Sequence, residues 1–177
     1  MVNWICLALM WKWGYENDEG MNTKIKRLAP FTYYGSKSRH LDWLYGLFPS
    51  EQLYDHYVEP FAGSAVVFLN KKPSPIETIN DANSRIVNFF KVLENDESLS
   101  RLQHLLEFTP YSRQVFIESL ESSPDPIEDA RRFFVRSMAG IGGAAHSKRR
   151  EHSWRSVKKY VHGGEIIPYR KFDTKAD

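Results

Sequence analysis

Short apolar runs alternate with amphipathic stretches between residues 30 and 97. The spacing predicts a buried strand over residues 56–58 and a second strand over residues 76–79, with a helix over residues 65–70 between them. A further helix begins at Asn83 or Ser84, and its apolar face contains Ile86, Val87, Phe90 and Leu93. The order strand, helix, strand, helix is typical of a parallel sheet covered by helices, so we expect an α/β fold.

A helix is also expected ahead of the first strand. Ser36 is placed to cap it, and Pro49 stops it. Leu41, Leu44 and Leu47 recur at helical spacing, so we expect all three to lie on one apolar face.

Beyond residue 97 the pattern is helical, and no strand is expected. Leucines 99, 102, 105 and 106 give one apolar stripe, a second follows Pro110, and a third begins near Pro126 and runs into the glycine-rich residues 139–143. We therefore expect an α-helical, basic module over residues 98–161, following a first part over residues 21–97. Residues 162–177 show no periodicity and remain unassigned.

Residues 1–20 differ from the rest of the chain. Their apolar run, from Trp4 to Trp13, has no Lys or Arg ahead of it and no clear small-residue cleavage site, so it does not fit a signal peptide. We expect a peripheral extension whose deletion leaves thermal stability nearly unchanged. Met21 would serve as an alternative start.

Composition excludes several classes of protein. The 177 residues suit one domain or slightly more, and 25 aromatic residues with 26% charged residues argue against disorder. No apolar run approaches the roughly 20 residues that span a bilayer. Cys6 is the single cysteine and the six histidines are scattered, so neither an internal disulfide nor a bound metal is expected. A reducing, cytoplasmic setting follows.

The net charge of +2 is divided unevenly along the chain. Residues 1–130 hold 12 Lys and Arg against 18 Asp and Glu, a net charge of −6, whereas residues 131–177 hold 12 against 4, a net charge of +8. A basic segment on an acidic body is the pattern of a nucleic-acid-binding protein. A solvated charged face is the alternative.

An aromatic turn over residues 30–37 is the first candidate site. Gly35 and Ser36 permit a tight turn, Lys37 supplies a cation, and Tyr33 and Tyr34 supply flat faces. Such residues suit an anionic ligand that carries an aromatic ring, and an ordinary aromatic-rich turn is the alternative.

A second candidate site follows the first strand. Glu59 closes the strand, and the small residues of 62–65 would let a ligand approach the backbone ahead of a helix. Open α/β sheets bind nucleotides beyond the carboxyl ends of their strands. The segment has a single glycine, so it is neither the G-x-G-x-x-G fingerprint nor a phosphate loop, and a ligand without phosphates fits better.

Asp81 is the third candidate, because it closes the second strand 22 residues after Glu59. An acidic side chain about 20 residues past the first loop can accept hydrogen bonds from two ribose hydroxyls. Alternatively, Asp81 or Asn83 caps the helix that follows, and the two roles are compatible.

Together the three segments resemble the DNA adenine methylase family over roughly residues 28–140. Residues 33–37 are similar to its aromatic-glycine-lysine turn, residues 58–65 to its methionine-binding loop, and residues 80–83 to its ribose-binding motif. The resemblance implies a partial Rossmann-like sheet that binds S-adenosylmethionine, followed by an α-helical target-recognition module. It further implies that Tyr33, Lys37 and Asp81 contact the cofactor and that Glu59, Phe61 and Gly63 line its site.

The same resemblance implies methyl transfer to the exocyclic amino group of adenine in double-stranded DNA, without a metal. Basic residues of the helical module would then face the phosphate backbone. They include Arg131, Arg136, Lys148, Arg149, Arg150 and Arg155.

The sequence departs from the family at its catalytic signature, Asp/Asn-Pro-Pro-Tyr/Phe, which the 177 residues do not contain. That signature orients the adenine amino group, so no catalytic residue is assigned and the chain is expected to have little activity alone. The simplest interpretation is a truncated methyltransferase, and a separate chain could supply the catalytic half.

Two other functions remain open. A non-catalytic DNA-binding remnant that no longer uses the cofactor would also explain the missing signature. An RNA or protein methyltransferase would share the cofactor segments, but the turn at residues 33–37 fits it less well.

Overall fold

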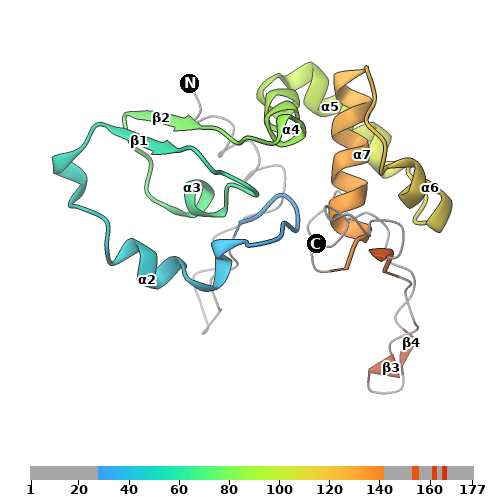
Figure 1. The fold of residues 1–177 in the computed structure, drawn as a ribbon, viewed down its shortest axis with the longest axis horizontal. Helices are drawn as coiled ribbons and strands as arrows, with labels where there is room; N and C mark the ends of the chain where they lie inside the picture. The colour runs from blue at the N-terminus through green and yellow to red at the C-terminus, as the bar shows by residue number, and fades with distance from the viewer. Residues whose placement is uncertain (1–27, 142–152, 156–160, 163–164, 167–177) are drawn as a thin grey trace.

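The computed structural model describes residues 28–141, 153–155, 161–162 and 165–166. A small sheet with helices α2 and α3 occupies one side of the molecule, and helices α4 to α7 occupy the other (Figure 1). The predicted extension at residues 1–20 lies outside the described residues. The helices are α2 (Leu41–Tyr45), α3 (Val66–Asn70), α4 (Ser84–Glu94), α5 (Asp96–Glu107), α6 (Arg113–Glu118) and α7 (Pro126–Ala139), with 3-10 turns at Lys37–Arg39 and Glu51–Leu53.

The sheet contains the two predicted strands, β1 (His56–Glu59) and β2 (Ile76–Ile79). They are parallel, with His56 beside Ile76 and Glu59 beside Ile79, and α3 lies in the connection between them. This confirms the mixed α/β character and the parallel pairing that the sequence predicts. Within the described residues this sheet has two strands, so each strand has an outer edge without a neighbouring strand.

The two faces of the sheet differ in exposure. Tyr57 and Ile79 pack against residues of α3, whereas the opposite face is exposed and consists of His56, Val58, Ile76 and Thr78. The prediction of a buried first strand is therefore wrong, and Val58 is 52% exposed. A parallel sheet is normally covered on both faces, and the described residues supply only one covering layer.

Helix α3 begins abruptly after the loop of small residues. Ala65 precedes it with φ of 51°, and Val66, Val67 and Phe68 are all buried. At its end, the Asn70 side chain accepts a hydrogen bond from the Leu28 N–H (2.8 Å) and donates to the Leu28 carbonyl (2.7 Å). The first described residue of the chain is thereby fixed beside α3.

The helix predicted from Ser36 to Pro49 is not continuous. A 3-10 turn and the short α2 meet at His40, and Ser36 makes no side-chain capping hydrogen bond. Leu41 is buried, but Leu47 is 63% exposed. The stripe of leucines ends because α2 stops at Tyr45, where the Gly46 N–H closes the last turn.

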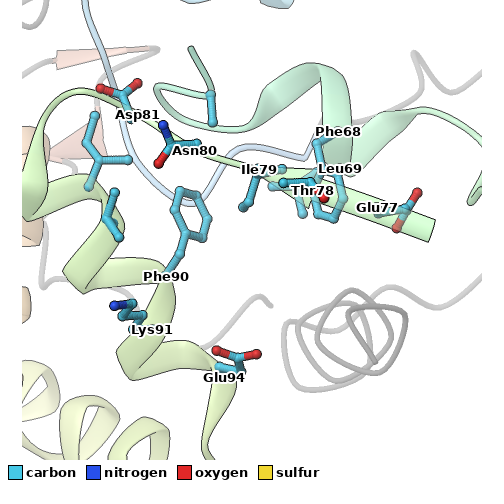
Figure 2. A pocket seen from close by; sticks show the side chains of 13 residues that line it. Phe68, Leu69, Glu77, Thr78, Ile79, Asn80, Asp81, Phe90, Lys91 and Glu94 are labelled. Carbon is cyan, nitrogen blue, oxygen red and sulfur yellow. The ribbon is translucent and has the colours of Figure 1, made fainter. Parts of the chain in front are cut away.

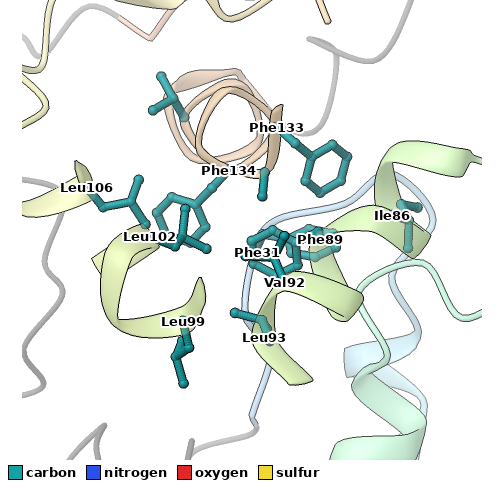
Figure 3. Packing of buried hydrophobic residues seen from close by; sticks show 12 residues of the cluster. Phe31, Ile86, Phe89, Val92, Leu93, Leu99, Leu102, Leu106, Phe133 and Phe134 are labelled. Atoms are coloured by element: carbon teal, nitrogen blue, oxygen red, sulfur yellow. The ribbon is translucent and has the colours of Figure 1, made fainter. Parts of the chain in front are cut away.

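The remaining helices form one packed group around α7 (Figure 1). Side chains cap all four of them, with Asn83 starting α4, Asn95 starting α5, Ser112 starting α6 and Asp125 starting α7. The largest apolar cluster joins residues of α4, α5 and α7 to Phe31 (Figure 3). Its members are Phe31, Ile86, Phe89, Val92, Leu93, Leu99, Leu102, Leu106, Ala130, Phe133, Phe134 and Val135. Helix α4, which the sequence places in the first part, therefore shares a core with the later helices α5 and α7.

Residues 153–155 lie beside the end of α7. The Ile141 N–H donates to the Ser153 carbonyl (2.7 Å), and the Arg155 N–H donates to the Ala139 carbonyl (2.8 Å). Two short antiparallel strands, β3 (Val161–His162) and β4 (Glu165–Ile166), follow, although the sequence predicts no strand beyond residue 97. In the described part of the chain, no helix is long and apolar enough to cross a membrane.

Candidate functional site

Asp81 connects the loops that follow the two parallel strands. Its Oδ2 accepts a hydrogen bond from the Gly63 N–H (2.9 Å), and its Oδ1 accepts one from the Asn83 N–H (2.9 Å). The cap of α4 is Asn83, whose side chain accepts from the Arg85 N–H (3.1 Å). Of the two predicted roles, helix capping thus belongs to Asn83, while Asp81 holds the Gly63 loop at the sheet edge.

Tyr33 lies against this same loop. A Cβ atom placed on Gly63 would be 3.1 Å from Cδ1 of the Tyr33 ring, and Gly63 has φ of +52°. The backbone conformation therefore favours glycine, and the close approach of the ring leaves little room for a side chain. Phe31 anchors the turn, since its ring packs edge-on against Phe133 with centroids 4.9 Å apart.

Glu59 is buried at the end of β1. Its Oε2 accepts hydrogen bonds from the Phe68 N–H (3.1 Å) and the Tyr57 hydroxyl (3.2 Å). Its Oε1 lies 4.0 Å from Nζ of Lys37, whose side chain is half exposed. Burial raises the pKa of the Glu59 carboxyl, and the Tyr57 hydrogen bond and the Lys37 charge oppose part of that rise. The arrangement is a buried carboxylate with a cation at its open side.

Five of the six predicted cofactor residues are therefore linked by contacts. Tyr33, Gly63 and Asp81 form one group, and Lys37 with Glu59 forms a second. Both groups lie at the carboxyl end of the sheet. The sixth residue, Phe61, follows β1 directly and is 74% exposed.

A cavity of about 290 Å³ adjoins Asp81 on the side of β2 that faces α4 (Figure 2). Asn80 and Asp81 lie at one end of it, and Lys91 and Glu94 lie at the other. Apolar side chains make up most of the remaining wall, and they are Ala62, Phe68, Leu69, Ile79, Ile86, Val87 and Phe90.

Sequence reasoning missed these wall residues as site residues. It assigned Ile86, Val87 and Phe90 to the apolar face of a helix. The buried residues of α4 are instead Ile86, Phe89, Val92 and Leu93, and the partly buried Val87 and Phe90 border the cavity. The helical period identifies an apolar face without showing where the sheet fails to cover it. Among the described residues, no group of three or more His, Cys, Asp or Glu is arranged to hold a metal ion.

Arg131 does not occupy the position expected of a DNA contact. Its Nε and Nη2 donate to the two carboxylate oxygens of Glu128 (both 2.7 Å), and its Nη1 donates to Thr109 (3.1 Å). The side chain is 16% exposed. The phosphate contact expected for Arg131 does not agree with this internal role.

Arg136 is buried on α7, with its guanidinium carbon 5.8 Å from the centre of the Phe133 ring. The expected phosphate contact does not agree with that position either, because α7 is covered on most of its circumference. Arg155 is exposed, and its carbonyl accepts a hydrogen bond from the Tyr111 hydroxyl (2.8 Å). Residues 148–150, the other expected contacts, lie outside the described residues.

Comparison with known proteins gives one family. A family model described as D12 class N6 adenine-specific DNA methyltransferase matches residues 33–153. The match spans both groups of site residues, the cavity and helices α4 to α7. No curated protein matches the chain.

Proposed function

Because the chain belongs to the D12 class N6 adenine-specific DNA methyltransferase family, we propose that it binds S-adenosylmethionine for methylation of adenine in duplex DNA. The observation that carries this proposal is the link between Asp81 and Gly63, with Tyr33 against the same loop. Three segments that are separate in the sequence meet there, beyond the carboxyl ends of β1 and β2, where α/β sheets bind nucleosides.

The residues present fit such a cofactor. Each Asp81 oxygen accepts one backbone hydrogen bond, and a carboxylate offers about four acceptor positions, so Asp81 can still accept from two ribose hydroxyls. The cavity beside Asp81 has apolar walls that suit a flat base. Glu59 would pair with the ammonium of the amino-acid end, and Lys37 with its carboxylate.

The cofactor supplies an electrophilic methyl group, and the described residues serve to bind and orient it. The catalytic signature of the family is absent from the 177 residues. We propose that these 177 residues bind the cofactor but have little methyltransferase activity by themselves. Among the described residues, the exposed sheet face and the unpaired strand edges support this proposal, since a parallel sheet is normally part of a larger covered sheet.

DNA is the proposed macromolecular partner. The charge of +8 over residues 131–177 supports it, as does the exposed Arg155 beside α7. The alternative of a DNA-binding remnant without cofactor is not favoured, because the contacts around Asp81 and Gly63 are intact.

Calorimetry with S-adenosylmethionine tests the proposal. Asp81→Ala should weaken binding by about 1–3 kcal/mol, because the ribose hydroxyls and the Gly63 N–H would lose a charged acceptor. Asp55→Ala is the matched control, since Asp55 is exposed just ahead of β1, away from the site. Failure of the unmodified chain to bind at millimolar cofactor would refute the proposal.

A further inference from the structure

Tyr57 lies beneath the site and belongs to none of its predicted residues. It is two residues ahead of Glu59 on β1, so the two side chains share a face of the sheet. The Tyr57 ring packs against α3, and Nζ of Lys71 lies 4.3 Å from the ring centre. Its hydroxyl donates to Oε2 of Glu59 at 3.2 Å.

The two oxygens of the Glu59 carboxylate differ in their hydrogen-bond partners. Both of its hydrogen-bond donors, the Tyr57 hydroxyl and the Phe68 N–H, contact Oε2. Oε1 has no hydrogen bond among the described residues, and the nearest cation is Lys37 at 4.0 Å. One oxygen is thus anchored on the protein side, and the other is available to a ligand.

We propose that Tyr57 is a positioning residue for the cofactor site: with the Phe68 N–H, its hydroxyl anchors Oε2 of Glu59 and thereby presents Oε1 to the ammonium of S-adenosylmethionine. This inference rests on the proposed function and deepens it. A hydrogen bond to a buried carboxylate favours its ionised form, which is the form that pairs with an ammonium.

The charged groups around the pair are consistent with this role. Lys37 faces Glu59 from the 3-10 turn, and Lys71 approaches from the end of α3. Lys71 is itself paired with Glu77 and is almost fully buried, so its charge is largely neutralised. Tyr45 and Glu77 are the other titratable groups near Tyr57. In the part of the chain that the structure describes, Tyr57 is therefore the closest side-chain donor to Glu59.

Removal of the hydroxyl should change the pH dependence of binding. Burial already raises the pKa of Glu59, and the Tyr57 hydrogen bond lowers it. In Tyr57→Phe the pKa rises further, so the carboxylate becomes protonated at a higher pH and the loss of cofactor affinity on acidification begins earlier. At neutral pH we expect binding to weaken by about 2- to 10-fold, the loss of one hydrogen bond.

The experiment measures the Kd for S-adenosylmethionine by calorimetry between pH 5 and 8, in the wild type and in Tyr57→Phe. Tyr45→Phe is the matched control, because its hydroxyl donates to the Val67 carbonyl (2.9 Å) in the same apolar cluster. The Glu59 carboxyl is titrated in parallel by ¹³C NMR without cofactor. We expect the NMR midpoint to rise in Tyr57→Phe and to stay in place in Tyr45→Phe.

A double-mutant cycle separates positioning from a general loss of structure. If Tyr57 acts through Glu59, Tyr57→Phe has no further effect on affinity in a Glu59→Gln background. An equal loss in both backgrounds, or an unchanged NMR midpoint, would overturn the inference. If Tyr57→Phe does not fold, 3-fluorotyrosine can replace Tyr57 instead. Its hydroxyl is a stronger hydrogen-bond donor, so the NMR midpoint of Glu59 should fall rather than rise. Absence of binding by the wild type would refute the proposed function. The NMR midpoint of Glu59 is measured without cofactor, so it tests the role of Tyr57 independently.

Discussion

At the scale of single residues, Gly63 shows how little freedom the loop after β1 has. Its φ of +52° is disfavoured for other residues, and the Tyr33 ring occupies the space a side chain would need. The backbone conformation and the contact are independent constraints on one position. Any substitution there should disturb the ring as well as the loop.

We predict that Gly63→Ala lowers both stability and cofactor affinity. The strain alone costs about 1–2 kcal/mol, and displacement of Tyr33 adds to it. Gly35→Ala is the comparison, because Gly35 also has a positive φ (75°) but a Cβ atom placed there would meet no atom within 4 Å. Urea denaturation should show a larger loss for Gly63→Ala. Equal losses would mean that the Tyr33 contact is unimportant.

Residue chemistry was predictable where it depends on position along a strand. Glu59 and Asp81 were identified from their places at strand ends, and both lie at the carboxyl edge of the sheet. For Arg131 the sequence already contains the signal for an ion pair, because Glu128 precedes it by three residues and such pairs meet on a helix. Tyr57 was overlooked because a tyrosine in a strand usually signifies packing alone.

At the scale of elements, α7 is the centre of the helical group and its first turns carry a charged cluster. Glu128 accepts hydrogen bonds from Arg131 (2.7 Å) and Arg132 (2.8 Å). These bonds, chiefly that of Arg131, lower the pKa of Glu128 from 4.5 to about 2 against the opposing effect of burial. The cluster fixes Arg131 against Thr109, at the end of α5.

We predict that this cluster makes stability depend on pH in acid. Because the folded pKa is lowered, the contribution is fully present above about pH 4.5 and is lost as the pH falls toward 2. Its size should be about 0.5–1 kcal/mol, since the group is partly exposed. Urea denaturation at pH 6 and pH 3 should show a smaller difference in Glu128→Gln than in the wild type. Glu107→Gln, an exposed residue of α5, should leave the difference unchanged.

Elements were predictable where the local pattern decides them. Helices α4, α5 and α7 were predictable because each has a capping side chain and an apolar face. The two parallel strands were predictable from their short apolar runs. The length of α2 was not predictable, because three leucines at helical spacing fit a longer helix equally well. The exposure of β1 was not predictable either, since an apolar run does not reveal whether a second layer covers it.

At the scale of the whole molecule, charge is separated along the chain, and the basic residues of the C-terminal part divide into two kinds. Arg131 and Arg136 serve the interior of the helical group. The proposed DNA contacts then fall on Arg155 and on residues 148–150. Arg155 follows Trp154, which pairs with Gly140 at the end of α7.

We predict that DNA binding depends on these three residues through their charge. Replacing Lys148, Arg149 and Arg150 by Gln should reduce the slope of log affinity against log salt by about 2–3, or about 0.9 for each lost phosphate contact. Fluorescence anisotropy with a duplex at several salt concentrations measures the slope. Replacing Lys72 and Arg101, exposed cations of the acidic part, is the control. An unchanged slope would place the DNA contacts elsewhere.

The open edges of β1 and β2 bear on how the protein would be produced and measured. In the part of the chain that the structure describes, the strand edges are unpaired and lie beside exposed apolar side chains, a combination that favours aggregation. Ligands that bind only the folded state raise its melting temperature by mass action. A melting temperature that rises with the concentration of S-adenosylmethionine would therefore be a second measure of the proposed cofactor binding.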